Sequence, residues 1–223
     1  MEKDKNEQAD VTDRIAGFLQ TYRKPLVVLL VLIAVVVTGS IAFFLIRGLM
    51  EKKAIAAVEV LERKKNELGL MDNMSKTIEI MALLDEFNDF APSTFGYAAA
   101  RAYSSTADIY YSLGEWDKAE EAWDRAARKA PKIYLAPLAL FNAAVAAEEQ
   151  GKLEAAVDYY SRSLEFSGIF PAAARARFNV GRICEAQNNR AGAIEAYRAL
   201  AEKNPNSNWA KLAQSRLIVL EME

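Results

Sequence analysis

The first pattern along the chain is a single uninterrupted apolar run. Residues 25–46 read PLVVLLVLIAVVVTGSIAFFLI, and no charged residue interrupts these 22 positions. A helix of this length spans about 33 Å, which matches a bilayer hydrocarbon core of about 30 Å. The hydroxyls of Thr38 and Ser40 are tolerable in such a helix because they can bond back to its own backbone. The run therefore predicts a transmembrane helix rather than a buried core helix.

The flanks of this run bear on processing and orientation. The small residues Gly39 and Ser40 are a faint cleavage cue, but residues 41–46 continue apolar where a cleaved signal peptide should lead into polar sequence. We therefore predict an uncleaved anchor. Basic residues are equally frequent on the two sides, so the positive-inside rule does not decide the orientation. Residues 1–24 are charged, with apolar positions at helical spacing, and fit either a helix on the membrane face or a loosely ordered tail.

After the apolar run, polar and apolar positions alternate with a helical period, and the pattern itself repeats every 37 residues. A repeated helical pattern predicts a stack of similar helix pairs. Small residues allow two helices to approach closely, aromatic residues fill the wedge between pairs, and Gly or Asn ends the first helix in a left-handed conformation. The four columns are Ala107, Ala144 and Gly181; Gly114, Gly151 and Asn188; Ala119, Ala156 and Ala193; and Trp123, Tyr160 and Tyr197.

The first of these units, from Tyr103 through Ala107, Gly114 and Trp123 to Pro131, resembles the tetratricopeptide repeat consensus. The stretches 137–168 and 174–205 follow it more loosely, with Arg177 replacing the usual first aromatic residue of the third repeat. The resemblance implies an all-α fold: one N-terminal transmembrane helix, then an α-solenoid of about three helix pairs with a C-terminal capping helix. The expected divisions are a tail (1–24), the transmembrane helix (25–46), a helical neck and degenerate repeat (47–93), three repeats (94–206) and the capping helix (207–223).

Composition narrows the possible chemistry. The net charge is −2, which argues against a nucleic-acid partner. The chain contains no histidine and one cysteine, Cys184, so the commonest general base and thiolate clusters are missing. Neighbouring acidic pairs such as Glu120 and Glu121 point in different directions on a helix and indicate a solvated face. We therefore expect no enzyme activity, no catalytic residue, no metal, no cofactor and no small-molecule substrate.

The resemblance to the family also suggests where a partner binds. In tetratricopeptide repeats the first helix of each pair lines a concave groove. Aromatic side chains anchor apolar groups and arginine pairs well with carboxylates, so these residue types indicate a groove for an extended or helical protein segment. The groove residues carried over by this resemblance are Arg101, Asp108, Tyr111, Phe141, Asn142, Arg175, Phe178, Asn179 and Arg182.

The whole arrangement of head, anchor, neck and repeats is similar to that of the ancillary subunit of the bacterial Sec translocon, including a basic pair, Arg23 and Lys24, before the anchor. That resemblance implies a protein-binding scaffold or chaperone-like adaptor of the bacterial inner membrane. Its repeats would lie on the periplasmic side, with the translocon and exported or envelope proteins as partners and the bilayer contacting residues 25–46. Two alternatives stay open: a structural component of an envelope or cell-division assembly, and an adaptor that faces the cytoplasm.

Overall fold

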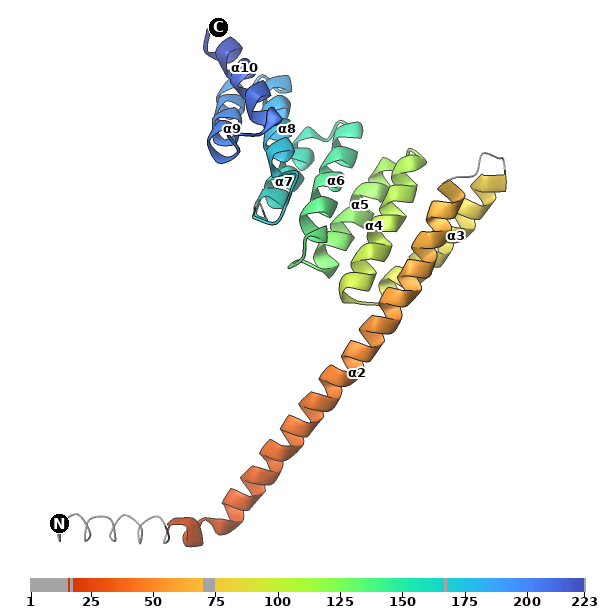
Figure 1. Cartoon of the computed structure of the whole chain (residues 1–223), viewed down its shortest axis with the longest axis vertical. Coiled ribbons are helices and arrows are strands. Elements are labelled where there is room, and N and C mark those ends of the chain that lie inside the picture. Colours follow the sequence, from red (N-terminus) through yellow and green to blue (C-terminus); the bar gives the residue numbers. More distant parts are fainter. Residues whose placement is uncertain (1–15, 17, 70–74, 167, 223) are drawn as a thin grey trace, which may run out of the picture. The chain divides into compact units, whose positions relative to one another are not determined.

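The computed structural model describes residues 16, 18–69, 75–166 and 168–222 (Figure 1). Every regular element within these ranges is a helix. Most of the predicted N-terminal tail and a short part of the neck, residues 70–74, lie outside the described residues. The chain divides into two compact units, residues 1–50 and 51–223, which are described one at a time.

The apolar run of the first unit is helical throughout. It belongs to α2 (Arg23–Gly69), and the most hydrophobic 18-residue window of this helix has a mean hydropathy of 3.0 and no buried residue. Thr38 donates its hydroxyl hydrogen to the carbonyl of Ala34 at 2.8 Å, and Ser40 donates to Val36 at 2.7 Å, so both hydroxyls are satisfied by the helix itself. By length and composition this segment is a candidate membrane span.

The second unit is built from consecutive antiparallel helix pairs, and each helix packs on the next along the chain (Figure 1). The end of α2, from residue 51, packs with α3 through Val58, Leu61, Leu83 and Phe87, and Lys64 forms an ion pair with Glu86. The remaining helices are α3 (Ser75–Ser93), α4 (Gly96–Ser112), α5 (Trp116–Lys129), α6 (Leu135–Glu149), α7 (Leu153–Leu164), α8 (Ala173–Ala186), α9 (Arg190–Lys203) and α10 (Asn208–Met222).

The same backbone turn ends the first helix of each of the three repeats. Gly114, Gly151 and Asn188 have φ values of 77°, 71° and 59°, which confirms the left-handed conformation predicted for this column. In each case the following amide closes a hydrogen bond to the carbonyl five residues earlier: 2.9 Å for residues 115 and 110, 2.9 Å for 152 and 147, and 2.8 Å for 189 and 184. This is the Schellman pattern, which satisfies carbonyls that the helix end would otherwise leave free.

The other repeated columns form the seams of the stack. The alanines at positions 107, 144, 119, 156 and 193 are completely buried, and Trp123, Tyr160 and Tyr197 are at most 4% exposed. In the third repeat, Gly181 lies directly against the ring of Tyr197. The small and aromatic columns therefore pack as their residue types predicted.

The helix α10 covers the end of the third repeat. Its residues Ala210, Ala213 and Leu220 are buried in a cluster with Tyr197 and Leu200. Trp209 adds a ring contact to Phe178, with centroids 5.2 Å apart. The neighbouring Val219 is 38% exposed, so Leu220 and not Val219 belongs to this cluster.

Candidate functional site

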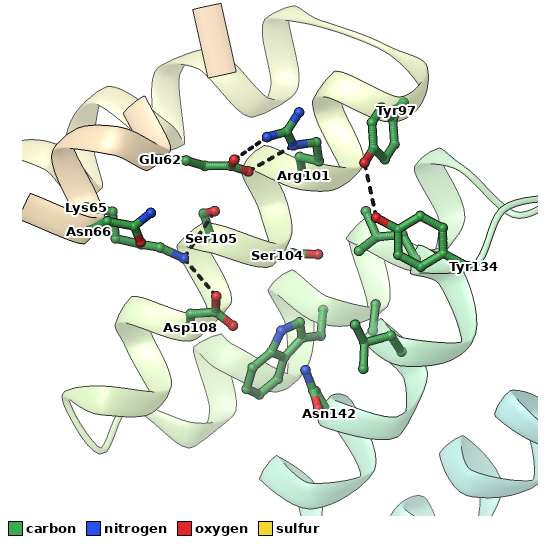
Figure 2. Close-up of a pocket in the computed structure, with 14 residues that line it drawn as sticks. Glu62, Lys65, Asn66, Tyr97, Arg101, Ser104, Ser105, Asp108, Tyr134 and Asn142 are labelled. Atoms are coloured by element: carbon green, nitrogen blue, oxygen red, sulfur yellow. Dashed lines mark hydrogen bonds and ion pairs between the residues drawn. The ribbon is translucent and has the colours of Figure 1, made fainter. Parts of the chain in front are cut away.

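A pocket of about 400 Å³ lies where the neck meets the first two repeats (Figure 2). Its walls come mainly from α2, α4 and the start of α6, which is the layer of first helices, and α5 contributes one aromatic side chain. The lining side chains are Glu62, Lys65, Asn66, Tyr97, Arg101, Ser104, Ser105, Asp108, Trp123, Tyr134, Leu135, Leu138, Ala139 and Asn142.

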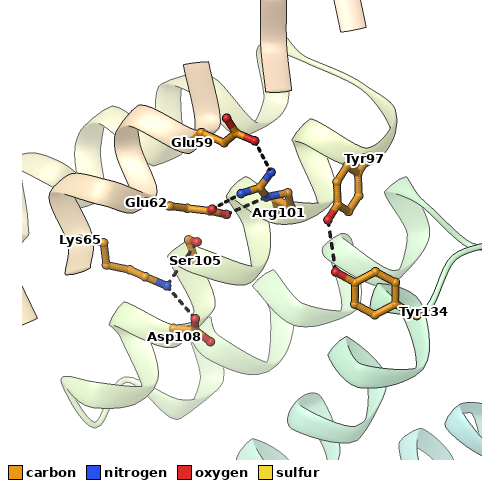
Figure 3. Close-up of polar contacts among 8 residues, drawn as sticks. All are labelled: Glu59, Glu62, Lys65, Tyr97, Arg101, Ser105, Asp108 and Tyr134. Atoms are coloured by element: carbon orange, nitrogen blue, oxygen red, sulfur yellow. Dashed lines mark hydrogen bonds and ion pairs between the residues drawn. The ribbon is translucent and has the colours of Figure 1, made fainter. Parts of the chain in front are cut away.

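Three ion pairs, two from Arg101 to Glu59 and Glu62 and one from Lys65 to Asp108, connect α2 to α4 at one side of this pocket (Figure 3). The Nε atom of Arg101 donates to Glu62 at 3.1 Å, and a second guanidinium nitrogen contacts the other oxygen of the same carboxylate. Hydrogen bonding to Glu62 raises the pKa of Arg101, so this guanidinium stays charged. Lys65 donates to Asp108 at 2.8 Å and to Ser105 at 3.3 Å. The neck therefore already engages two charges that were expected to face an open groove.

Two buried polar atoms of the pocket have no hydrogen-bond partner within the described part of the chain. They are the indole Nε1 of Trp123 and the hydroxyl oxygen of Ser104. A buried donor left unsatisfied costs about 1–3 kcal/mol, and nearly all buried polar groups in proteins are paired. An acceptor brought into the pocket by a bound segment would satisfy the indole, which has only a donor to offer.

The structure brings together three of the predicted groove residues. Arg101, Asp108 and Asn142 all line the pocket. Tyr111 contributes indirectly: its ring lies 5.6 Å from that of Trp123, and its hydroxyl donates to Glu149 at 3.2 Å. Burial is the main cause that raises the pKa of Tyr111, so the phenol stays protonated at neutral pH.

Phe141 and Asn179 lie elsewhere, within the seam between the second and third repeats. Phe141 is 5% exposed, and its ring centroid is 5.1 Å from that of Tyr160 and 5.9 Å from that of Phe170. Asn179 is buried and donates to the hydroxyl of Tyr160 at 2.8 Å. The expectation that both side chains face an open groove is corrected. The reason is that the connector between α7 and α8 folds Phe170 back over this position.

The remaining three predicted residues, Arg175, Phe178 and Arg182, do not line the pocket either. Phe178 is half-buried between Tyr197 and Trp209 at centroid distances of 5.5 and 5.2 Å. The guanidinium of Arg175 lies 5.2 Å from the ring centroid of Phe141. Arg182 forms an ion pair with Glu148, which also accepts a 2.6 Å hydrogen bond from Tyr160. Arg175 and Arg182 thus link the second and third repeats, whereas Phe178 packs between α9 and α10.

Sequence reasoning missed several lining residues, among them Glu62, Lys65, Tyr97 and Tyr134. The first two were interpreted as part of a connecting neck, although residues 51–68 form an amphipathic helix that needs a partner. The two tyrosines carry a signal that was available, because they are 37 residues apart and occupy one column of the repeat. Their hydroxyls lie 3.2 Å apart, and this hydrogen bond is the main cause that raises the pKa of Tyr97.

A stack of helix pairs with a polar pocket in its first-helix layer defines the class of α-solenoid repeat proteins. Residues 105–168 and 165–208 match the sequence profile of the tetratricopeptide repeat. The chain is also 35% identical over 225 residues to a TPR repeat-containing protein of Treponema pallidum (strain Nichols), and this similarity covers 94% of both chains. The chain belongs to the tetratricopeptide repeat family. Members of this family are generally non-enzymatic scaffolds that bind other proteins, and the matches indicate no catalytic family.

Proposed function

We propose that this tetratricopeptide repeat protein is a membrane-anchored scaffold or chaperone-like adaptor. The apolar part of α2 holds it in a bacterial inner membrane, and its repeats attend exported or envelope proteins on the periplasmic side. The pocket between the neck and the first two repeats takes a segment of the partner protein. The role resembles that of the ancillary subunit of the Sec translocon.

The anchor is supported by two independent features. Within the described part of the chain, no surface covers the apolar side chains of residues 25–46: Leu30 is 67% exposed and Val36 is 66% exposed. Such a face in water would promote aggregation, whereas a lipid environment covers it. The similarity to the treponemal protein omits only 6% of the chain, about 13 residues. Since 24 residues precede this segment, the similarity extends through it.

The pocket is the observation that carries the binding role. Its walls are polar, its charged groups are already paired, and its unsatisfied groups are the indole N–H of Trp123 and the hydroxyl of Ser104. A neutral acceptor fits this arrangement better than a charged group would. Amide carbonyls of an extended chain, from the main chain or from Asn and Gln side chains, supply such acceptors. Asn142, at the same pocket, can both donate to and accept from a peptide group.

The orientation is tested by topology reporters. We would fuse an export-dependent reporter and a cytoplasm-dependent reporter, in separate chains, after Glu223. Activity from the export-dependent fusion alone is expected. Activity from the cytoplasmic fusion alone would exclude the export and envelope role and leave a cytoplasm-facing adaptor.

The binding role is tested by site-specific photo-crosslinking in living bacteria. A photoreactive amino acid replaces Leu138, which lines the pocket and is 40% exposed. The matched control replaces Leu212 on α10, which is 50% exposed and does not line the pocket. We expect adducts with many newly exported proteins from position 138 and their loss in the Trp123→Phe variant. One constant adduct that persists when export is blocked would instead identify a structural assembly component.

A further inference from the structure

A second groove, of about 570 Å³, lies between the second and third repeats in the layer of second helices. Its sides are α7 and α9 and its floor is α8. Arg177, Val180 and Cys184 face it from α8, and they follow each other at helical spacing. Arg175, Phe178 and Arg182 are each two residues away from these positions, about 200° around the helix, and so belong to the other side of α8. This groove shares no lining residue with the pocket of the proposed function.

The groove lies where two aromatic side chains of the preceding junction are replaced, one by alanine and one by lysine. Between the first and second repeats, Tyr159 and Phe166 of the second repeat pack against the core. One repeat later, 37 residues on, the same positions carry Ala196 and Lys203. Positions 196 and 203 of the third repeat therefore carry no aromatic ring, and both line the groove.

The ion pair of the preceding junction is also missing. There, Asp124 is 7% exposed and accepts a 3.0 Å hydrogen bond from Arg162. The equivalent positions one repeat later are Ser161 and Ala199, and both line the groove. The carboxylate and its cationic partner have been removed together with the aromatic rings.

A buried guanidinium remains at the floor of this groove. Arg177 is 8% exposed, and its guanidinium donates to the neutral amide oxygen of Asn204 at 2.8 Å. Burial lowers the pKa of Arg177, and no carboxylate among the described residues counteracts this shift. A buried cation without a counter-charge is costly, whereas a carboxylate forms short, charge-assisted hydrogen bonds with a guanidinium.

We propose that this groove binds a protein segment that presents an aromatic side chain next to a carboxylate. The aromatic ring fills the space left by Ala196 and Ala199, and the carboxylate reaches Arg177. The partner thereby supplies from outside the two groups that Tyr159 and Asp124 supply within the preceding junction.

Charged residues at the edge of the groove restrict the kind of ligand that it accepts. Glu165 and Glu195 lie at the edge and repel a small free anion, while Lys203 lies at the same edge and attracts one. A carboxylate on the same segment as a buried aromatic ring is held near Arg177 by the contacts of that ring. A free anion has no such contacts. Acetate or phosphate alone should therefore not bind, and the aromatic group and the carboxylate are both required.

The test uses the full chain in lipid nanodiscs and a set of water-soluble, end-capped heptapeptides. Each peptide carries p-benzoylphenylalanine and one glutamate, separated by zero to three residues, and each has a partner with glutamine in place of glutamate. After illumination, the adducts are mapped by mass spectrometry. For at least one spacing we expect labelling within residues 177–184 or 192–203, stronger by about tenfold for the glutamate peptide.

Three variants make the result specific. Arg177→Gln keeps a hydrogen-bonding group but removes the charge, and should equalise the glutamate and glutamine peptides. Ala196→Tyr restores the ring of the preceding repeat and should abolish labelling while leaving Arg177 in place. Arg198→Gln removes an exposed arginine of the same helix that pairs with Glu221, and should change nothing.

The proposal is overturned if no peptide of the set labels these segments, if the glutamate and glutamine peptides label wild-type chain equally, or if labelling survives Ala196→Tyr. Because Ala196→Tyr retains Arg177, its result stands even if Arg177→Gln fails to fold. Failure here leaves the proposed function intact, since that function depends on the pocket at Trp123 and on the orientation of the anchor.

Discussion

Gly181 and Tyr197 meet so closely that a Cβ atom on residue 181 would lie 2.4 Å from Cε1 of the tyrosine ring. The first two repeats use Ala107 and Ala144 in this column, and both are fully buried. The third repeat instead has glycine in this column, directly against the ring of Tyr197. Tyr197 can occupy that space only because residue 181 has no side chain.

This contact predicts that Gly181→Ala destabilises the protein. The added methyl group must displace a ring that is 1% exposed and held in the core, and such overpacking costs about 1–3 kcal/mol. The gain in helix propensity from glycine to alanine, about 1 kcal/mol, offsets only part of this cost. The measurement is the thermal unfolding midpoint of the full chain by circular dichroism.

The matched control is the double variant with Tyr197→Leu, in which the clash is absent. We expect the penalty of Gly181→Ala to be smaller in that background, because residues in contact are not additive. Equal penalties in both backgrounds would show that the ring is not the cause.

Asn188, just after the end of the same helix, should tolerate glycine but not alanine. Its φ of 59° lies in the left-handed region, where glycine is free of strain and alanine costs about 1–2 kcal/mol. Asn188→Gly should leave the midpoint unchanged or raise it, and Asn188→Ala should lower it. At Gly151 the native residue is already glycine, so Gly151→Ala should likewise lower the midpoint. A midpoint that alanine leaves unchanged would contradict the requirement for a left-handed residue.

The stack itself could be predicted from the sequence because its columns repeat at a constant interval. Every repeated residue type has a local role that depends on its own helix pair: Gly114 turns the chain, Ala119 allows close approach, and Trp123 fills the wedge. Such roles follow from periodicity and residue size, without knowledge of the neighbouring chain.

The groove was harder to predict because contacts between repeats decide which side chains remain accessible. Phe141 shares a column with Phe178 but is buried by Phe170, which belongs to the irregular connector between α7 and α8. Arg101 is in the pocket, yet its charge is engaged by Glu62 from the neck, 39 residues earlier. Periodicity places residues on a face, whereas connectors and caps determine what covers that face.

The contact between α8 and α10 predicts an acid-dependent loss of stability. Arg216 of α10 donates to Glu185 through its Nε atom at 3.1 Å, with a second guanidinium nitrogen on the other oxygen. The hydrogen bond from Arg216 is the main cause that holds the pKa of Glu185 below its ordinary value of 4.5. A carboxyl group with a lowered folded-state pKa stabilises the fold above the unfolded-state value, and that stabilisation is lost as pH falls through the folded-state pKa.

We therefore expect Glu185→Gln to unfold at a lower temperature than wild type at pH 7, and the difference between them to shrink towards zero as the pH falls below 4.5. The measurement is a series of thermal melts of both chains over this range. Glu221→Gln is a suitable control because Glu221 is more exposed and pairs with Arg198. A difference that stays constant with pH would mean that the ionisation of Glu185 does not contribute.

Phe178 and Arg182 were expected to capture a partner, but their contacts predict an effect on stability first. Phe178 is held between Tyr197 and Trp209, and truncating a packed phenylalanine to alanine costs about 3–5 kcal/mol when it is fully buried. Since Phe178 is only half-buried, the lower end of that range is expected for Phe178→Ala. Arg182→Ala should cost less, because its ion pair with Glu148 is half exposed. Melts by circular dichroism distinguish the two, and an unchanged melt of Phe178→Ala would restore the view that its ring is free for a partner.

Arg101 joins the neck to the first repeat, and its removal should loosen the neck selectively. The guanidinium contacts Glu62 through two nitrogens and Glu59 at 3.4 Å, and its side chain is 20% exposed. Arg101→Ala leaves the partly buried Glu62 without its counter-charge, which disfavours the packing of residues 55–69 on α4. We expect faster hydrogen exchange of the backbone amides of 55–69 and unchanged exchange in residues 173–203. Arg125→Ala is the control, since Arg125 pairs with Glu121 within its own helix. Unchanged exchange in the neck of Arg101→Ala would mean that the apolar contacts around Val58 and Leu61 hold this helix without the ion pair.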